Sequence, residues 1–137
     1  MSSRLFVFLA VLTFVFSAPA CAASNRQVNV SNLRMALDRE GRDVRSSFAP
    51  NDVFYVFADL ANARRGTKLE AKWIAVNTAG ADPNFQFQTQ TLDLSDDTFT
   101  GKIYFQLSND KPWPVGQYRV DLYLNGAPAG GVEFSVQ

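Results

Sequence analysis

Hydrophobic and polar residues alternate along much of the chain, most clearly over 116–125. In that segment the apolar side chains recur at every second position, at Tyr118, Val120, Leu122 and Leu124. Side chains of a β-strand point alternately to its two faces, so this spacing predicts a strand with one buried face. The Asn125-Gly126 pair follows directly and favours a tight hairpin turn, because both residue types tolerate positive φ angles.

Further segments carry the same signal, and no segment of useful length has a helical period. The other expected strands cover 27–37, 53–60, 67–76, 85–91, 98–108 and a last strand around Val132, Phe134 and Val136. The side chains expected to face the core are Phe54, Val56, Ala58, Leu60, Leu69, Ala71, Trp73, Phe99, Ile103, Phe105 and Leu107. The first strand changes phase at Ser31-Asn32, which predicts a bulge there. Seven short strands between turn signals predict an antiparallel β-sandwich over residues 22–137.

Two aromatic positions refine this expectation. Immunoglobulin sandwiches carry a buried tryptophan on the third strand and a tyrosine two residues before the second disulfide cysteine. Here Trp73 lies on the third expected strand, and Tyr118 lies two residues before Val120. Cys21 is the only cysteine, so hydrophobic packing must replace the disulfide. The expected fold class is therefore all-β, a seven-stranded antiparallel immunoglobulin-like β-sandwich with no disulfide.

Three stretches of sequence together resemble a known kind of module. They are Phe48–Asp52, Gly66–Trp73 and Trp113–Gly126. In combination they are similar to the immunoglobulin-like or fibronectin-III-like modules of bacterial secreted proteins and lipoproteins. The resemblance extends over nearly all of the chain after residue 21. It implies the fold and an exported protein, and it brings no catalytic motif with it, since the shared residues are core and turn positions.

The first 21 residues have a different character. Arg4 precedes an almost wholly apolar run over 5–16, and small residues fill 17–23. This order is typical of a secretory signal peptide, and the apolar run is shorter than the roughly 20 residues that cross a bilayer. Cleavage near Cys21 would release a periplasmic or secreted protein. Alternatively, Ala18–Cys21 resembles a lipobox, in which case lipidation of Cys21 would anchor the protein at the envelope; the sequence leaves both alternatives open.

Composition argues against most catalytic chemistry. The chain has no histidine, which removes the commonest general base and every triad that depends on one. No two carboxylates are convincingly paired for acid–base work, and Asp93, Asp96 and Asp97 have turn chemistry rather than a calcium-loop spacing. We therefore expect no enzyme activity, no cofactor and no metal. Basic and acidic residues both number 13 and are interspersed, so no nucleic-acid partner is expected.

Five residues are candidates for binding. Tyr104 and Tyr123 fall on outward strand positions, and Trp113 lies in a loop, where exposed aromatic rings would mark a binding surface. The alternative is ordinary cross-strand packing, with Trp113 plugging one end of the sandwich. Arg64 and Arg65 share a turn and would either steer an acidic partner or form a solvated surface.

These features favour a binding or accessory module of the bacterial cell envelope that engages a protein partner. The alternative is a small carbohydrate-binding module that uses the exposed aromatic rings. Contact with a membrane is expected only through a lipid on Cys21.

Overall fold

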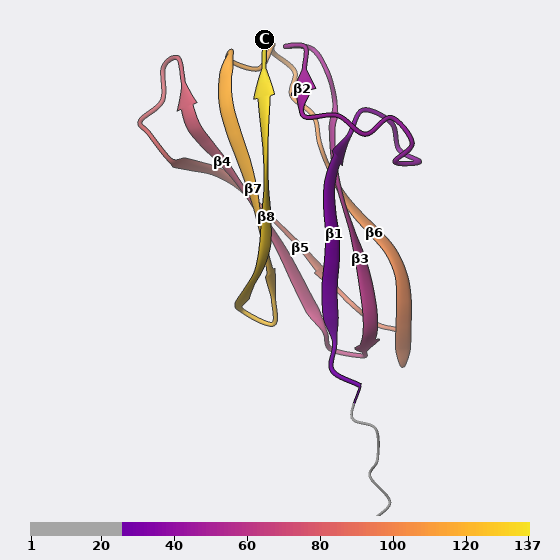
Figure 1. Ribbon diagram of the computed structural model, residues 1–137. Helices are drawn as coiled ribbons and strands as arrows, with labels where there is room; N and C mark the ends of the chain where they lie inside the picture. The colour runs from indigo at the N-terminus through magenta and orange to yellow at the C-terminus, as the bar shows by residue number, and fades with distance from the viewer. Residues whose placement is uncertain (1–25) are drawn as a thin grey trace, which may run out of the picture.

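The computed structural model describes residues 26–137, which form two facing β-sheets and contain no helix (Figure 1). One sheet has the strand order β1-β3-β6, with β1 (Asn29–Ala36), β3 (Phe54–Arg64) and β6 (Thr98–Leu107). The other has the order β2-β8-β7-β4-β5, with β2 (Ser47–Phe48), β8 (Ala127–Val136), β7 (Gly116–Leu124), β4 (Lys68–Thr78) and β5 (Phe85–Asp93). The all-β, two-sheet architecture predicted from alternation is confirmed. The signal peptide and Cys21 lie outside the described residues.

The predicted number of strands is wrong, because residues 26–137 form eight strands rather than seven. The additional strand is β2, whose two residues run parallel to the end of β8. Ser135 N–H donates to the Ser46 carbonyl at 2.8 Å, and Gln137 N–H donates to the Phe48 carbonyl at 3.0 Å. Two residues are too few to show any period, so this strand exists only through its partner and leaves no local signal in the sequence.

Irregular backbone positions confirm the sequence prediction at two places and correct it at a third. The register of β1 against β3 shifts between Ser31 and Arg34, and Asn32 has a φ of 54°, which confirms the predicted bulge. Asn125 and Gly126 both have positive φ, as the hairpin prediction requires. The expected end of the second strand at residue 60 is wrong, since β3 continues to residue 64 after a second bulge that interrupts its alternation.

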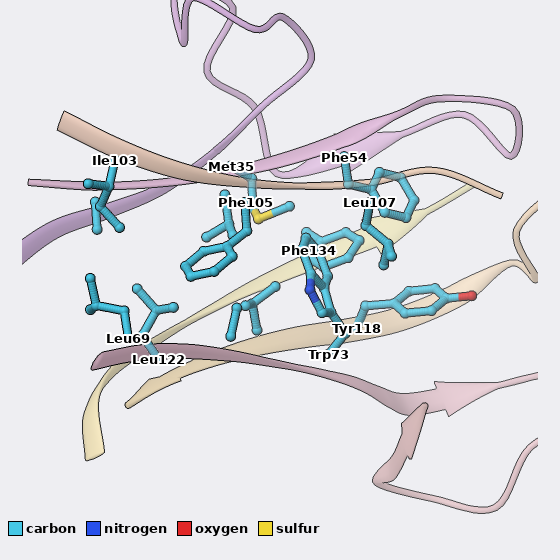
Figure 2. Packing of buried hydrophobic residues seen from close by; sticks show 14 of the residues in the cluster. Met35, Phe54, Leu69, Trp73, Ile103, Phe105, Leu107, Tyr118, Leu122 and Phe134 are labelled. Atoms are coloured by element: carbon cyan, nitrogen blue, oxygen red, sulfur yellow. The ribbon is translucent and has the colours of Figure 1, made fainter. Parts of the chain in front are cut away.

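The core lies between the sheets, and Figure 2 shows side chains of both sheets pointing toward one another. Every expected inward residue of β3 and β4 is buried, whereas Phe99, Leu124 and Val132 are half-buried at the margins. Phe134 lies at the centre of the aromatic packing together with Phe54, and its ring meets Phe48, Phe54, Trp73 and Tyr118 at centroid distances of 4.9–6.2 Å. Aromatic pairs in these geometries stabilise a fold by more than the burial of their apolar surface alone.

Phe57 is buried on the outside of its sheet, where the sequence pattern predicts an exposed side chain. The segment between β1 and β2 covers it. Gly41 lies so close that a Cβ atom there would be 3.0 Å from the Phe57 ring. The guanidinium carbon of Arg34 and the ammonium nitrogen of Lys102 lie 5.5 and 5.2 Å from the centroid of the same ring, in cation–π contact with it. A loop thus extends the core beyond the two sheets.

Candidate functional site

An apolar hollow of about 180 Å³ opens at one end of the sandwich. The loops between β4 and β5 and between β6 and β7 form its rims, and the inner faces of β4, β5 and β7 form its floor. Its lining consists of Ala75, Thr78, Ala81, Phe85, Phe87, Asn109, Trp113, Pro114 and Tyr118. Phe85 is 52% exposed, which is unusual for so large an apolar side chain beside a hollow. The hollow is therefore an accessible apolar surface rather than a closed cavity.

The loop between β6 and β7 is held rigidly against the core. Trp113 Nε1 donates to the Asp52 carbonyl at 3.1 Å, and the indole stacks on Phe54 at a centroid distance of 5.0 Å. The Tyr118 hydroxyl donates to the Pro114 carbonyl at 2.6 Å. The two anchors fix the loop from both sides, so the rim of the hollow is preorganised.

The sequence predicts that Trp113 either presents an exposed ring or plugs the end of the sandwich, and the second alternative holds. Only 9% of its surface is exposed, because its face is covered by Phe54. Phe87 lies beside it at a centroid distance of 6.0 Å and meets Tyr118 edge-on at 6.1 Å. What remains accessible is the part of the indole that lines the hollow.

The hollow is nearly free of ionisable chemistry. Of the residues that line it, Tyr118 alone titrates, and burial raises the pKa of its hydroxyl. The phenol therefore stays protonated and keeps donating to Pro114. Thr78 and Asn109 are the other polar side chains of the lining. Such a surface can hold an apolar group and orient it with few hydrogen bonds, and it offers no acid–base pair.

Tyr104 and Tyr123 lie on the outer faces of different sheets. Arg39 Nε donates to the Tyr104 hydroxyl at 3.0 Å, and this hydrogen bond raises the pKa of the Arg39 guanidinium. The ammonium group of Lys72 lies over the Tyr123 ring at 4.2 Å from its centroid. A side chain of the protein thus already covers or holds each ring, and the two tyrosines are not brought together with Trp113.

Arg64 and Arg65 lie at the opposite end of the sandwich from the apolar hollow. Arg65 forms an ion pair with Asp97, with Nη2 and Oδ1 2.8 Å apart. Arg64 lines a separate hollow of about 330 Å³ together with Arg26 and Asn62. The five candidate residues therefore do not form one site. The three aspartates considered for calcium do not gather either, since residues 26–137 contain no group of three metal-ligating side chains.

One ionic cluster on the outer face of the β1-β3-β6 sheet should give the fold an acid dependence. Asn32 donates to the Asp59 carboxylate at 2.8 Å, and Arg34 lies 3.5 Å from it. The hydrogen bond from Asn32 and the charge of Arg34 lower the pKa of Asp59. Because the unfolded value is about 3.9, the ionised carboxylate stabilises the fold above that pH, and this contribution is lost as the pH falls through the lower folded value.

We expect Asp59→Asn to flatten the loss of stability below about pH 4, measured by urea unfolding at several pH values. Asp110→Asn, at an exposed carboxylate in the loop between β6 and β7, is the matched control and should leave the wild-type pH dependence in place. Identical acid profiles for wild type and Asp59→Asn would contradict this assignment.

The sequence predicts a strand over 85–91, but it does not show that Phe85 and Phe87 line a hollow with Trp113 or which loop faces them. Their alternation with glutamine is visible, but the approach of residues 109–114 depends on how the sheets face each other. Within residues 26–137 no helix is long and apolar enough to span a membrane.

No family model matches the chain, and no curated protein matches it either. Its fold is similar to part of the Pseudomonas fluorescens alkylpurine DNA glycosylase AlkC bound to DNA containing an abasic site analog. The identity is 14% and the TM-score 0.50, over 80% of this chain and 30% of that one. It is also similar to part of a β-glucosidase from Listeria innocua in complex with glucose, with 14% identity and a TM-score of 0.51, over 80% of this chain and 16% of that one. The chain thus spans under a third of either protein, and the likeness concerns the fold alone.

Proposed function

We propose that the protein is a non-catalytic binding module of the bacterial cell envelope and that it engages a protein partner through the apolar hollow. The observation that carries the proposal is the combination of the half-exposed Phe85 with a rim held rigid by Trp113 and Tyr118. Preorganised apolar hollows with few polar groups suit the insertion of an apolar side chain from a partner.

The finer fold belongs to the same proposal, namely an immunoglobulin-like or fibronectin-III-like sandwich. Trp73 is fully buried on β4, and Tyr118 lies two residues before the buried Val120 of β7. The hydroxyl of Tyr118 bonds to a carbonyl four residues upstream, as the tyrosine corner of such domains does. The β2 strand is then an addition to the seven-stranded plan, and it pairs with the end of the chain.

The proposed location is the envelope, either free after cleavage of the signal peptide or tethered by a lipid on Cys21. The described chain starts at one end of the sandwich and finishes at the other (Figure 1). Gly116 pairs with Thr78 at the end of the ladder near the hollow, and on its other side it pairs with Val136, the residue before the C-terminal Gln137. Residue 26, where the described chain begins, thus lies at the end of the sandwich remote from the hollow.

Carbohydrate binding is the weaker alternative. Sugar stacking needs a free aromatic face, but Phe54 stacks on one face of Trp113 and the ammonium group of Lys72 lies over the Tyr123 ring. The hollow also offers few polar groups for sugar hydroxyls. A glycan array is expected to show no binding by the wild-type protein. Binding that Ala81→Trp removes would support the alternative instead.

Filling the hollow tests the proposal directly. Ala81 is half-exposed at the rim, so Ala81→Trp should occupy the hollow at a stability cost within about 1 kcal/mol. Ala127→Trp, at an exposed position at the start of β8, is the matched control. After brief chemical crosslinking in the native cell, we expect discrete protein adducts of wild type and Ala127→Trp and about tenfold fewer of Ala81→Trp. Equal adducts from both variants would contradict a partner site in the hollow.

A further inference from the structure

We propose that the partner binds as an extended strand that pairs with the free edge of β5 and places one apolar side chain in the hollow. This inference rests on the proposed function and adds its mode of recognition. Strand addition gains affinity from main-chain hydrogen bonds and specificity from pockets for alternate side chains. The β5 edge and the hollow that begins at Phe85 and Phe87 provide both.

The outward hydrogen-bonding groups of β5 can be assigned from the ladder. Strand β5 lies at the edge of its sheet and pairs only with β4. Leu94 N–H donates to the Thr67 carbonyl, so alternation directs the backbone groups of Leu92, Gln90 and Gln88 toward β4. The N–H and C=O groups of Thr89 and Thr91 then point away from the sheet. Both residues are exposed, which leaves these groups accessible to another strand.

The protecting devices on β5 are confined to the charge of Asp93 at its end and a register shift against β4 opposite Trp73 and Ile74. Residues 84–92 include no charged residue and no proline, although these are the usual devices that prevent strand addition. The edge strands of the other sheet both carry a charged residue within the strand, Arg34 on β1 and Lys102 on β6. In addition, the Gln90 side chain donates to the Gln106 carbonyl at 2.7 Å and occupies part of the β6 edge. The β5 edge is thus the one best prepared to accept a strand.

Charge favours a neutral or basic strand over an acidic one. Asp82 lies at the hollow end of β5, and Asp93 ends the strand, with Lys68 opposite it on β4. A second copy of β5 fits poorly. Antiparallel pairing centred on Thr89 would set the Asp93 carboxylate of one copy beside Phe85 of the other, and the hollow would receive a charge instead of an apolar group. The occupant is therefore a segment of a different protein, with an apolar anchor and lysine or arginine beyond it.

The test uses a phage-displayed library of linear peptides selected on the immobilised protein, followed by affinity measurements with a selected synthetic peptide. Thr89→Pro/Thr91→Pro removes the outward N–H groups without touching the bonds to β4, which edge strands tolerate. Thr89→Val/Thr91→Val keeps both N–H groups and is the matched control. We expect the proline variant and Ala81→Trp each to weaken binding about tenfold or more, and the valine variant to bind as wild type.

Because proline substitutions can also lower the stability of the protein, a second experiment removes the same hydrogen bonds by modifying the peptide instead. N-methylation of the peptide amides that face β5 should weaken binding to wild type, and methylation of the alternate amides should not. Loss of binding with Ala81→Trp alone, unaffected by proline and N-methylation, would overturn strand addition and leave the hollow as a partner site. Selection of no peptide, or self-association of wild type that the proline variant abolishes, would also overturn it.

Discussion

Replacing Gly116 with alanine is expected to destabilise the domain by at least about 3 kcal/mol, enough to unfold much of it. Gly116 has a φ of 148°, which L-residues rarely adopt, and it begins β7 opposite Thr78. A Cβ atom there would lie 2.2 Å from the Asn77 carbonyl oxygen and 2.9 Å from the Thr78 Cα. Both are backbone atoms, so the contact cannot be relieved by turning a side chain. The start of β7 would shift and take Tyr118 with it.

Gly126→Ala provides the matched control. Its φ of 83° is also positive, but nothing lies within 4 Å of a Cβ atom at that position. It should show the conformational cost alone, about 1–2 kcal/mol. Urea unfolding followed by circular dichroism measures both. Equal losses in the two variants would mean that the contact with Asn77 does not constrain the fold.

Trp73→Ala should cost about 3–5 kcal/mol, because it empties the centre of the core. The indole is completely buried, packs edge-on against Phe134, and donates from Nε1 to Gln90 at 2.9 Å. Part of the loss is the cavity and part is the hydrogen bond. Thermal and urea unfolding should agree, and a loss below about 1 kcal/mol would show that the centre of the core lies elsewhere.

The hydrogen bond can be separated from the cavity by a double-mutant cycle with Trp73→Phe and Gln90→Leu. Gln90→Leu alone leaves a buried indole N–H without its partner, at about 1–3 kcal/mol. In the Trp73→Phe background the same change should cost less, since there is no N–H to satisfy. Additive effects of the two changes would exclude a coupled bond between β4 and β5.

Alternation along the chain is enough to predict the two-sheet fold and most of its core. Tyr118, Val120 and Leu122 alternate with polar neighbours, and burial follows that period wherever a strand has one solvent-exposed face. Alternation does not predict burial or strand formation where contacts from another part of the chain determine them. Phe57 is buried by a loop, and β2 forms only because the end of β8 lies beside it. Neither contact is local in sequence.

The site is less accessible to sequence reasoning than the fold. Trp113 is recognisable as unusual, but its burial against Phe54 depends on a loop that spans from one sheet to the other. Tyr104 and Tyr123 are correctly predicted to lie outside the core, yet Arg39 and Lys72 hold them on separate faces. The alternation of a strand predicts which face a side chain lies on. It does not predict which residues of other elements contact that side chain. The hollow therefore emerges only from the structure.

The most direct test of a partner site at the hollow is site-specific photocrosslinking in the native cell, with a photoreactive phenylalanine at Phe85. The same group at Val44 is the control, because Val44 is 55% exposed and Phe85 52%, while Val44 lies between β1 and β2, away from the hollow. We predict a discrete protein adduct from position 85 that Ala81→Trp abolishes, and none from position 44. Adducts of equal yield from both positions, or none from position 85, would contradict a partner site at the hollow.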